Sequence, residues 1–312
     1  MPREMADAMV AARIVDARPV ARGLSWPECP RWHNGVLWFT DMYTGTLKTV
    51  DSSGVVRVVV DSSARAARAD VPIVLGGFGW LPDGRLIVVS MYERLLLVCG
   101  GMETPGGLSV YADLRDLAPF PINDMVVAAN GQAYVTQLGF DFFHGEKPAP
   151  SPIIVVDPTG NARAADSVAP LMGGNGIAIS GDGRRLYAAE AFANRIAAMD
   201  LDADGVLSNS RVFAECPSLP DGIGPDAEGG VWAAMPGSGY VARFVEGGAI
   251  TDAVAVPLEA GLGSACLLGG PHHDSLYVTV GVEVADFGKS ARDAAGSIWA
   301  ADVGFRGGAG RP

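Results

Sequence analysis

The sequence contains few cysteines, and none of them belongs to a recognisable metal or redox motif. Four cysteines occur among 312 residues, they lie far apart, and no two form a CxxC pair. This arrangement does not support a zinc ribbon or a thioredoxin-like redox site. We interpret the four as reduced and mostly buried thiols, as expected in the cytoplasm. They are Cys29, Cys99, Cys216 and Cys266.

Long apolar runs and clusters of basic residues are missing as well. Charged residues interrupt the first 20 positions, so the apolar core of a signal peptide is absent. No stretch of about 20 residues is free of charge, proline and glycine, which argues against a membrane-spanning helix. Lys and Arg number 23 against 35 Asp and Glu, and they form no cluster that could follow a phosphate backbone. We therefore expect a cytoplasmic protein that binds neither membranes nor nucleic acids.

Long helical periodicity is absent too, whereas glycine and proline are abundant. The chain has 41 glycines and 21 prolines, and 49% of its residues are hydrophobic. This hydrophobic content allows a large core, and the turn-forming residues favour many tight turns between short strands. The composition therefore predicts an all-β protein.

A repeated hairpin pattern is the strongest feature of the sequence. Six segments consist of a short apolar strand, a turn with Gly, Asp or Asn, and a second apolar strand. The turn glycines of the first five are separated by 49, 47, 52 and 46 residues. A sixth turn, around residues 272–274, follows about 45 residues later and lacks the glycine. The repeats begin near residues 28, 76, 123, 175, 221 and 264.

This period is typical of the blades of a β-propeller. A unit of about 45–50 residues with several strands matches one blade. We therefore expect an all-β, six-bladed β-propeller with four-stranded blades around a central channel, formed as a single domain by residues 1–312. The N-terminal strand expected near residues 14–23 would complete the last blade, and this closure would hide the sheet edges.

Polar side chains occupy the start of the first strand in four of the six repeats. Because the first strand of each blade lines the channel, residues at these positions should meet at one mouth. Two carboxylates and two amide oxygens would form a hard-oxygen site for Ca²⁺, Mg²⁺, Mn²⁺ or Zn²⁺, with positions left for water and substrate. The four residues are Glu28, Asn123, Asn175 and Asp221.

The same residues also have a purely structural interpretation. Asn-Gly and Asp-Gly pairs form turns in many β proteins, so Asn175 and Asp221 could simply begin turns. Glu28 is harder to explain in this way, because an acid beside an apolar strand needs a partner. The occurrence of all four at equivalent blade positions favours the metal site.

Four segments of the chain resemble the SMP-30/gluconolactonase family, which includes the senescence marker and luciferin-regenerating proteins. The resemblance extends over nearly the whole chain. It implies a six-bladed propeller that holds one divalent ion, with Ca²⁺ as the first choice, through Glu28, Asn123, Asn175 and Asp221. The segments are PECPRWHNGVLWFTD (27–41), NDMVVAANGQAYV (123–135), NGIAISGDGRRLYAAEAFANRIAAMDLDADGVLSN (175–209) and PDGIGPDAEGGVWAA (220–234).

The resemblance also implies roles in catalysis and substrate binding. Asp221 corresponds to the usual general-base candidate of the family, and Asp124, which contacts substrate in relatives, is the alternative base. Asn123 would adjoin the substrate together with Asp124. The family often has an arginine where this chain has Pro121, and the loss of that arginine argues against a sugar-lactone substrate.

Two further candidates for substrate contact come from the residues around the expected mouth. Phe78, in the second repeat, is one of several aromatic side chains that suggest an apolar pocket. His144 lies in the long insertion of residues 137–152 and could reach over the mouth. Both also have ordinary explanations, as packing and as solvated surface.

The sequence as a whole predicts a divalent-metal-dependent hydrolase that opens a small-molecule lactone or a related ester. The ion would polarise the carbonyl, and an activated water would attack it. The oligomeric state is left open. Two alternatives keep the fold and the ion: a non-sugar ring-opening or isomerase step in a biosynthetic or catabolic pathway, and a non-catalytic scaffold with a structural metal. No Gly-x-Ser-x-Gly motif favours a serine hydrolase instead.

Overall fold

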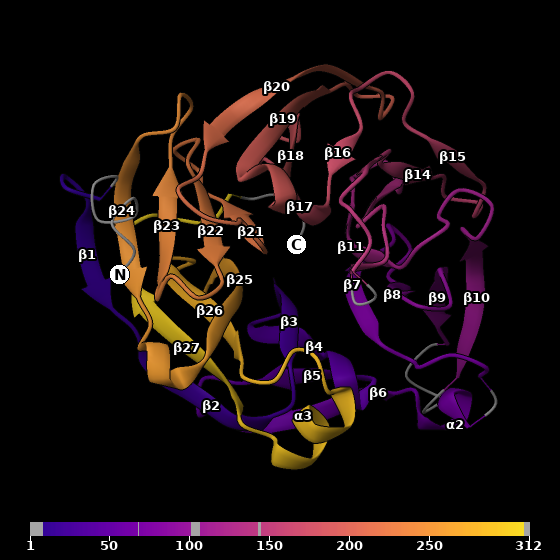
Figure 1. Ribbon diagram of the computed structural model, residues 1–312, viewed down its shortest axis with the longest axis horizontal. Helices are drawn as coiled ribbons and strands as arrows, with labels where there is room; N and C mark the ends of the chain where they lie inside the picture. The colour runs from indigo at the N-terminus through magenta and orange to yellow at the C-terminus, as the bar shows by residue number, and fades with distance from the viewer. Residues whose placement is uncertain (1–8, 68, 101–106, 143–144, 309–312) are drawn as a thin grey trace.

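Six four-stranded antiparallel arrays surround a central channel in the computed structural model (Figure 1). The structure describes residues 9–67, 69–100, 107–142 and 145–308. The prediction of a six-bladed β-propeller with four-stranded blades is confirmed. In blades one to five the strands run in chain order from the channel outward. Blades one to three contain β3 (Pro27–His33), β4 (Val36–Asp41), β5 (Thr46–Val50) and β6 (Val56–Asp61); β7 (Leu75–Trp80), β8 (Leu86–Ser90), β9 (Leu95–Cys99) and β10 (Leu108–Asp113); β11 (Ile122–Val127), β12 (Ala133–Gln137), β14 (Ile154–Val156) and β15 (Ala162–Ala164).

The other three blades follow the same plan, with additional strands at the ring closure and in one insertion. A two-stranded ribbon, β13 (Pro150–Ser151) with β16 (Leu171–Met172), lies beside blade three. Blades four to six contain β17 (Gly174–Ile179), β18 (Arg185–Glu190), β19 (Arg195–Leu201) and β20 (Leu207–Glu215); β21 (Ile223–Pro225), β22 (Val231–Met235), β23 (Tyr240–Phe244) and β24 (Ile250–Ala255); β25 (Leu262–Gly269), β26 (Ser275–Gly281) and β27 (Gly296–Asp302), with β2 (Arg18–Leu24) as the outer strand.

The N-terminal segment closes the ring by pairing with two blades. β2 pairs antiparallel with β27 of blade six, whereas β1 (Arg13–Asp16) pairs parallel with β24 of blade five. The single strand expected near residues 14–23 is therefore divided at Ala17, whose N–H donates to the Ala255 carbonyl (3.0 Å). One short segment thus ties two neighbouring blades together and covers the edge of each.

Helices play a small part in the described residues. α2 (Ser63–Ala66) follows β6, and α3 (Phe287–Asp293) lies in the connection between β26 and β27. Asp286 caps α3 by accepting a hydrogen bond from the Lys289 N–H (2.8 Å). None of the described helices is long and apolar enough to cross a bilayer. The cytoplasmic location stays a prediction.

The hydrophobic core consists of layers between neighbouring blades rather than one central cluster. Ile87 and Leu96 of blade two, for example, pack with Met125 and Val135 of blade three, and all four side chains are fully buried. The strands alternate their side chains between two such layers, so both faces of a blade are apolar. Because the apolar layers lie between the blades, polar residues at the ends of the innermost strands can face the channel.

The inner hairpins turn through residues with positive φ, as the Asn-Gly and Asp-Gly pairs predict. The glycines at positions 35, 84, 131, 183 and 229 have φ between 73° and 87°. In blade six this position is held by His273, with φ 57°, and its N–H donates to the Gly270 carbonyl (3.0 Å) as Gly84 donates to Leu81 (2.9 Å). His273 therefore adopts a backbone conformation that costs energy for a residue with a Cβ atom.

We expect His273→Gly to raise the free energy of unfolding by about 1 kcal/mol, because glycine adopts this φ without steric strain. His272→Gly is the matched control, since His272 does not have a positive φ and glycine there only adds freedom to the unfolded chain. Urea denaturation measures both. Equal effects of the two substitutions would contradict the strain at His273.

Candidate metal centre at the channel mouth

Local irregularities of the innermost strands aim the candidate residues at the channel. The pairing register shifts within β3, β11 and β17, at the point where each strand reaches the mouth. Bulges of this kind turn side chains away from the regular alternation of a strand. Asn123 and Asn175 lie inside such shifts, and Glu28 lies at the edge of one. The shifts fall between Glu28 and Arg31, Ile122 and Met125, and Gly174 and Ile177.

Glycine lets the inner strands approach one another closely at this mouth. A Cβ atom on Gly77 would lie 2.2 Å from Asp124 Oδ1, and one on Gly176 would lie 2.6 Å from the Asp221 carbonyl oxygen. Gly222 similarly approaches Ala265, at 2.2 Å. These distances exclude any side chain, so glycine brings the backbones of neighbouring blades together where the polar residues converge.

The four residues of the expected ligand set lie together at the mouth. Asn123 Nδ2 donates to Asn175 Oδ1 (2.9 Å), and the Asn175 side chain in turn hydrogen-bonds Asp221. Glu28 and Asp221 repel each other electrostatically across the channel. Glu28 accepts hydrogen bonds from its neighbour, the Cys29 N–H (3.0 Å). The residues come from blades one, three, four and five.

The acids of the mouth are held in an environment that disfavours their charged forms. Burial raises the pKa of Glu28 to about 7, opposed by the Cys29 N–H and the Ser264 side chain and reinforced by the charge of Asp124. Burial also raises the pKa of Asp221 well above its usual range, and the charges of Glu28 and Asp124 add to the effect. Two desolvated acids side by side would gain from a cation between them.

Asp124 has a different environment, because an arginine neutralises it. Arg31 Nη2 donates to Asp124 Oδ1 (2.9 Å), and both side chains are buried. The same Oδ1 accepts the Met125 N–H (2.7 Å), while Oδ2 accepts the Ile177 N–H (3.3 Å). Both carboxylate oxygens of Asp124 are therefore engaged inside the protein. Sequence reasoning missed Arg31, since no motif distinguishes it from other arginines.

The two other candidates for substrate contact are placed differently. Phe78 is fully buried, and its ring lies beneath the Arg31 guanidinium, 5.7 Å from ring centre to Arg31 Cζ. It has no exposed surface that a ligand could contact, because the ring packs in the layer between blades one and two. His144 lies outside the described residues.

Aromatic side chains from the strand connections surround the mouth. Tyr43 stacks on Phe287 of α3 (4.2 Å between ring centres), and Phe140 packs against Phe192 (4.9 Å). Burial and the nearby charges of Tyr92, Glu28 and Asp221 raise the pKa of Tyr43, which sets this phenol beside the acids. The repeat pattern could not reveal these rings, since they belong to the variable connections and not to the repeated strands.

The donor set fits a hard divalent cation. Two carboxylates balance a charge of +2, and carboxylate and amide oxygens are the ligands that Ca²⁺ and Mg²⁺ prefer. Arg31 forms its ion pair with Asp124, and no ion pair of Glu28 or Asp221 is found in the part of the chain that the structure describes. Within the described ranges, no group of three or more His, Cys, Asp and Glu side chains is arranged to hold a metal. The candidate centre therefore depends on its two asparagines.

These features define the class of protein: it is a six-bladed propeller with two acids and two asparagines at one mouth of its channel. The chain belongs to the SMP-30/Gluconolactonase/LRE-like family, whose model matches residues 26–282. The resemblance found in the sequence is thereby confirmed.

The most informative relatives span nearly the whole chain. Pentonolactonase XacC of Haloferax volcanii is 26% identical over 307 residues, which cover 95% of each chain. A solved structure of regucalcin from Agrobacterium tumefaciens, described as a calcium-binding protein, superimposes with a TM-score of 0.73 at 21% identity, over 95% of this chain and 97% of that one. A gluconolactonase from Xanthomonas campestris gives 0.67 at 23% identity, over 94% and 91%. The two structures support the fold.

We expect the metal-free protein to lose stability as the pH rises from about 5 to 8. Glu28 has a pKa near 7 in the folded protein and 4.5 as its ordinary value, so the folded state binds the extra proton. Its contribution is complete below the ordinary pKa and is lost as the pH rises through 7. Thermal unfolding with chelator present should show a midpoint that falls by several degrees over this range.

Glu28→Gln should flatten this pH dependence, because the amide does not titrate. Glu228→Gln, an exchange at an exposed position, should keep the slope of the parent protein. Identical slopes in all three proteins would show that Glu28 does not titrate in this range.

Proposed function

We propose that the protein hydrolyses a lactone with the help of one divalent ion held by Glu28, Asn123, Asn175 and Asp221. The lactonase class rests on the family membership and on the near-full-length relative named pentonolactonase. The metal-dependent step rests on one observation above all: two desolvated acids, Glu28 and Asp221, lie beside two amide side chains, a set of hard oxygen donors. Ca²⁺ is the ion we propose first, in line with the regucalcin structure described as calcium-binding.

The bound ion would supply a Lewis acid that polarises the lactone carbonyl and stabilises the oxyanion of the tetrahedral intermediate. Glu28 and the two asparagines hold and orient this centre. Asp221 takes the proton of the attacking water, since residue 221 is only partly buried at the mouth and, among the described residues, no arginine or lysine forms an ion pair with it, whereas Asp124 is paired with Arg31. A carboxylate has two oxygens, so one would be available to accept the proton of the water when the other holds the ion.

Asp124 is the weaker candidate for the base. Its two oxygens accept hydrogen bonds from Arg31, Met125 and Ile177, and it is 5% exposed. We assign it a positioning role: it fixes the inner strand that carries Asn123. The Asp124 N–H donates to Thr136 Oγ1 (3.1 Å), and that hydroxyl donates to the Asn175 carbonyl (2.7 Å), so Asp124 connects the two amide ligands through the backbone.

The substrate is a small cyclic ester whose ring carries an apolar substituent. Tyr43, Phe192 and Phe287, which are partly exposed, provide aromatic surface around the mouth. Pro121 supplies no side-chain hydrogen bond to a sugar hydroxyl at the position where an arginine is frequent in the family. Alkyl-substituted γ- and δ-lactones should therefore be better substrates than aldonolactones of the same ring size.

The direct test is hydrolysis of a panel of alkyl and sugar lactones by the chelated protein, before and after addition of Ca²⁺, Mg²⁺, Mn²⁺ or Zn²⁺. We expect turnover only with metal. Asp221→Asn should lower kcat at saturating metal by at least about 100-fold while the protein stays folded, because the amide cannot accept the proton. Asp204→Asn, at an exposed turn position, should keep the parent kcat.

The remaining outcomes discriminate between the alternatives. Metal binding by calorimetry without hydrolysis of any lactone would favour a structural ion in a scaffold or another ring-opening reaction. Hydrolysis that persists in Asp221→Asn but disappears in Asp124→Asn would make Asp124 the base. Hydrolysis that needs no metal would contradict the proposed mechanism.

A further inference from the structure

The sixth blade provides none of the four expected ligands, yet its innermost strand is irregular at the same place as the others. The pairing of β25 with β26 shifts in register between Gly263 and Ala265. Ser264 lies inside this shift, as Asn123 and Asn175 lie inside theirs. Because Ser264 is fully buried, its hydroxyl contacts neither solvent nor a molecule in the channel, and its hydrogen bonds must be formed within the protein.

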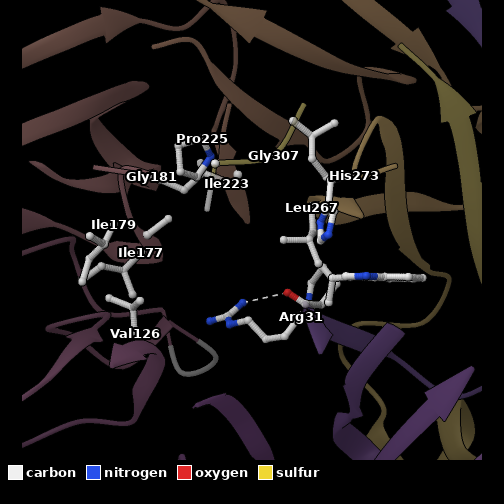
Figure 2. A pocket seen from close by; sticks show the side chains of 16 residues that line it. Arg31, Val126, Ile177, Ile179, Gly181, Ile223, Pro225, Leu267, His273 and Gly307 are labelled. Atoms are coloured by element: carbon white, nitrogen blue, oxygen red, sulfur yellow. Dashed lines mark hydrogen bonds between the residues drawn. The ribbon is translucent and has the colours of Figure 1, made fainter. Parts of the chain in front are cut away.

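The strand of Ser264 lies between the strands that lead to the two acids of the mouth. β25 packs against β3 on one side and against β21 on the other. The three strands stay together beyond the mouth, where one residue of each lines a common cavity of about 340 Å³ (Figure 2). These residues, which follow Glu28, Asp221 and Ser264 by two or three positions, are Arg31, Ile223 and Leu267.

The side chain of Ser264 holds Glu28. Its hydroxyl hydrogen-bonds the Glu28 carboxylate and lies 3.2 Å from the carbonyl oxygen of Pro27, on the peptide that precedes Glu28. Thr279 Oγ1 is 3.1 Å from the same hydroxyl. A serine hydroxyl has one proton to donate, and an ionised carboxylate is the strongest of these acceptors. With Glu28 ionised, Ser264 therefore donates to the carboxylate and can accept from the Thr279 hydroxyl.

The backbone of Ser264 is tied to the second acid. The Gly222 N–H donates to the Ser264 carbonyl (2.8 Å), and Gly222 directly follows Asp221. The Asp221 carbonyl in turn accepts the Gly176 N–H (3.2 Å). One residue of blade six thus contacts the acid of blade one through its side chain and the peptide next to the acid of blade five through its backbone.

We propose that Ser264 is a positioning residue of the metal centre, whose hydroxyl, supported by that of Thr279, fixes the Glu28 carboxylate where it can hold a divalent ion together with Asp221. The inference rests on the proposed function, since it needs an ion at this mouth. Ser264 acts through Glu28 and touches neither ion nor substrate. Loss of an outer contact of this kind typically lowers metal affinity by about 10- to 100-fold.

The test is calorimetric titration of the chelated full-length protein, without substrate, with whichever of Ca²⁺, Mg²⁺, Mn²⁺ and Zn²⁺ the parent binds most tightly. Ser264→Ala should raise the dissociation constant at least about tenfold. Ser297→Ala is the matched control and should keep the parent affinity, because it removes a buried hydroxyl of the same blade that accepts the Trp299 indole N–H (2.9 Å).

The outcomes separate this inference from the proposed function. Equal affinities of Ser264→Ala and the parent would overturn the role of Ser264 and leave the metal centre intact. A parent protein that binds none of the four ions would overturn the metal centre and the inference together.

Two variants of Thr279 separate positioning from general stability. Thr279 is fully buried; Thr279→Val keeps its shape and removes the hydroxyl, whereas Thr279→Ser keeps the hydroxyl and leaves a small cavity. We expect Thr279→Val to weaken metal binding several-fold, and Thr279→Ser to keep the parent affinity while it lowers the free energy of unfolding. The pair also decides the question should Ser264→Ala not fold. Weaker metal binding by Thr279→Ser than by Thr279→Val would show that blade six only supports the fold, and would overturn the proposal.

Discussion

The buried ion pair between Arg31 and Asp124 is the contact on which the candidate site at the channel mouth depends. It links blade one to blade three at 2.9 Å, and removing one partner of such a pair typically costs about 3–5 kcal/mol. Asp124 thereby has a counter-ion of its own, although its charge still adds to the burial that raises the pKa of Glu28 and of Asp221. On the other side, Arg31 is one of the residues that line a cavity of about 340 Å³.

The candidate metal centre lies where the regular pairing of the inner strands is interrupted. Register shifts in β3, β11 and β17 turn side chains toward the mouth, and glycines such as Gly77 and Gly176 allow a backbone approach that no other residue permits. Two acids with raised pKa values, Glu28 and Asp221, lie at this mouth. The layers between the blades bury apolar side chains on both faces of each blade, and this burial offsets the cost of placing the acids together. A bound cation would remove the repulsion between Glu28 and Asp221.

The predictions from the sequence rested on the repeated hairpin. They were correct for features that recur in every repeat and failed for features that do not. Blade number and the turn positions followed from the spacing of glycines, because tight hairpins need positive φ at fixed places. The chain near Ala17 was expected to continue one strand but divides between two blades, since ring closure is a property of the whole assembly. Phe78 was expected near the substrate but lies in the layer beneath Arg31, because the alternation of a strand does not reveal which face meets the channel at a bulge.

By itself the sequence determined the fold, the family and the positions at which polar residues would converge, because period, turn chemistry and the quoted segments are all local along the chain. Only the tertiary structure decided the chemical state of those residues. Asp124 and Asp221 look alike in sequence, yet Arg31, 93 positions from Asp124, neutralises one and leaves the other beside Glu28. A pKa depends on burial and on charges within a few ångströms, and those neighbours come from other blades, which the order of residues along the chain does not specify.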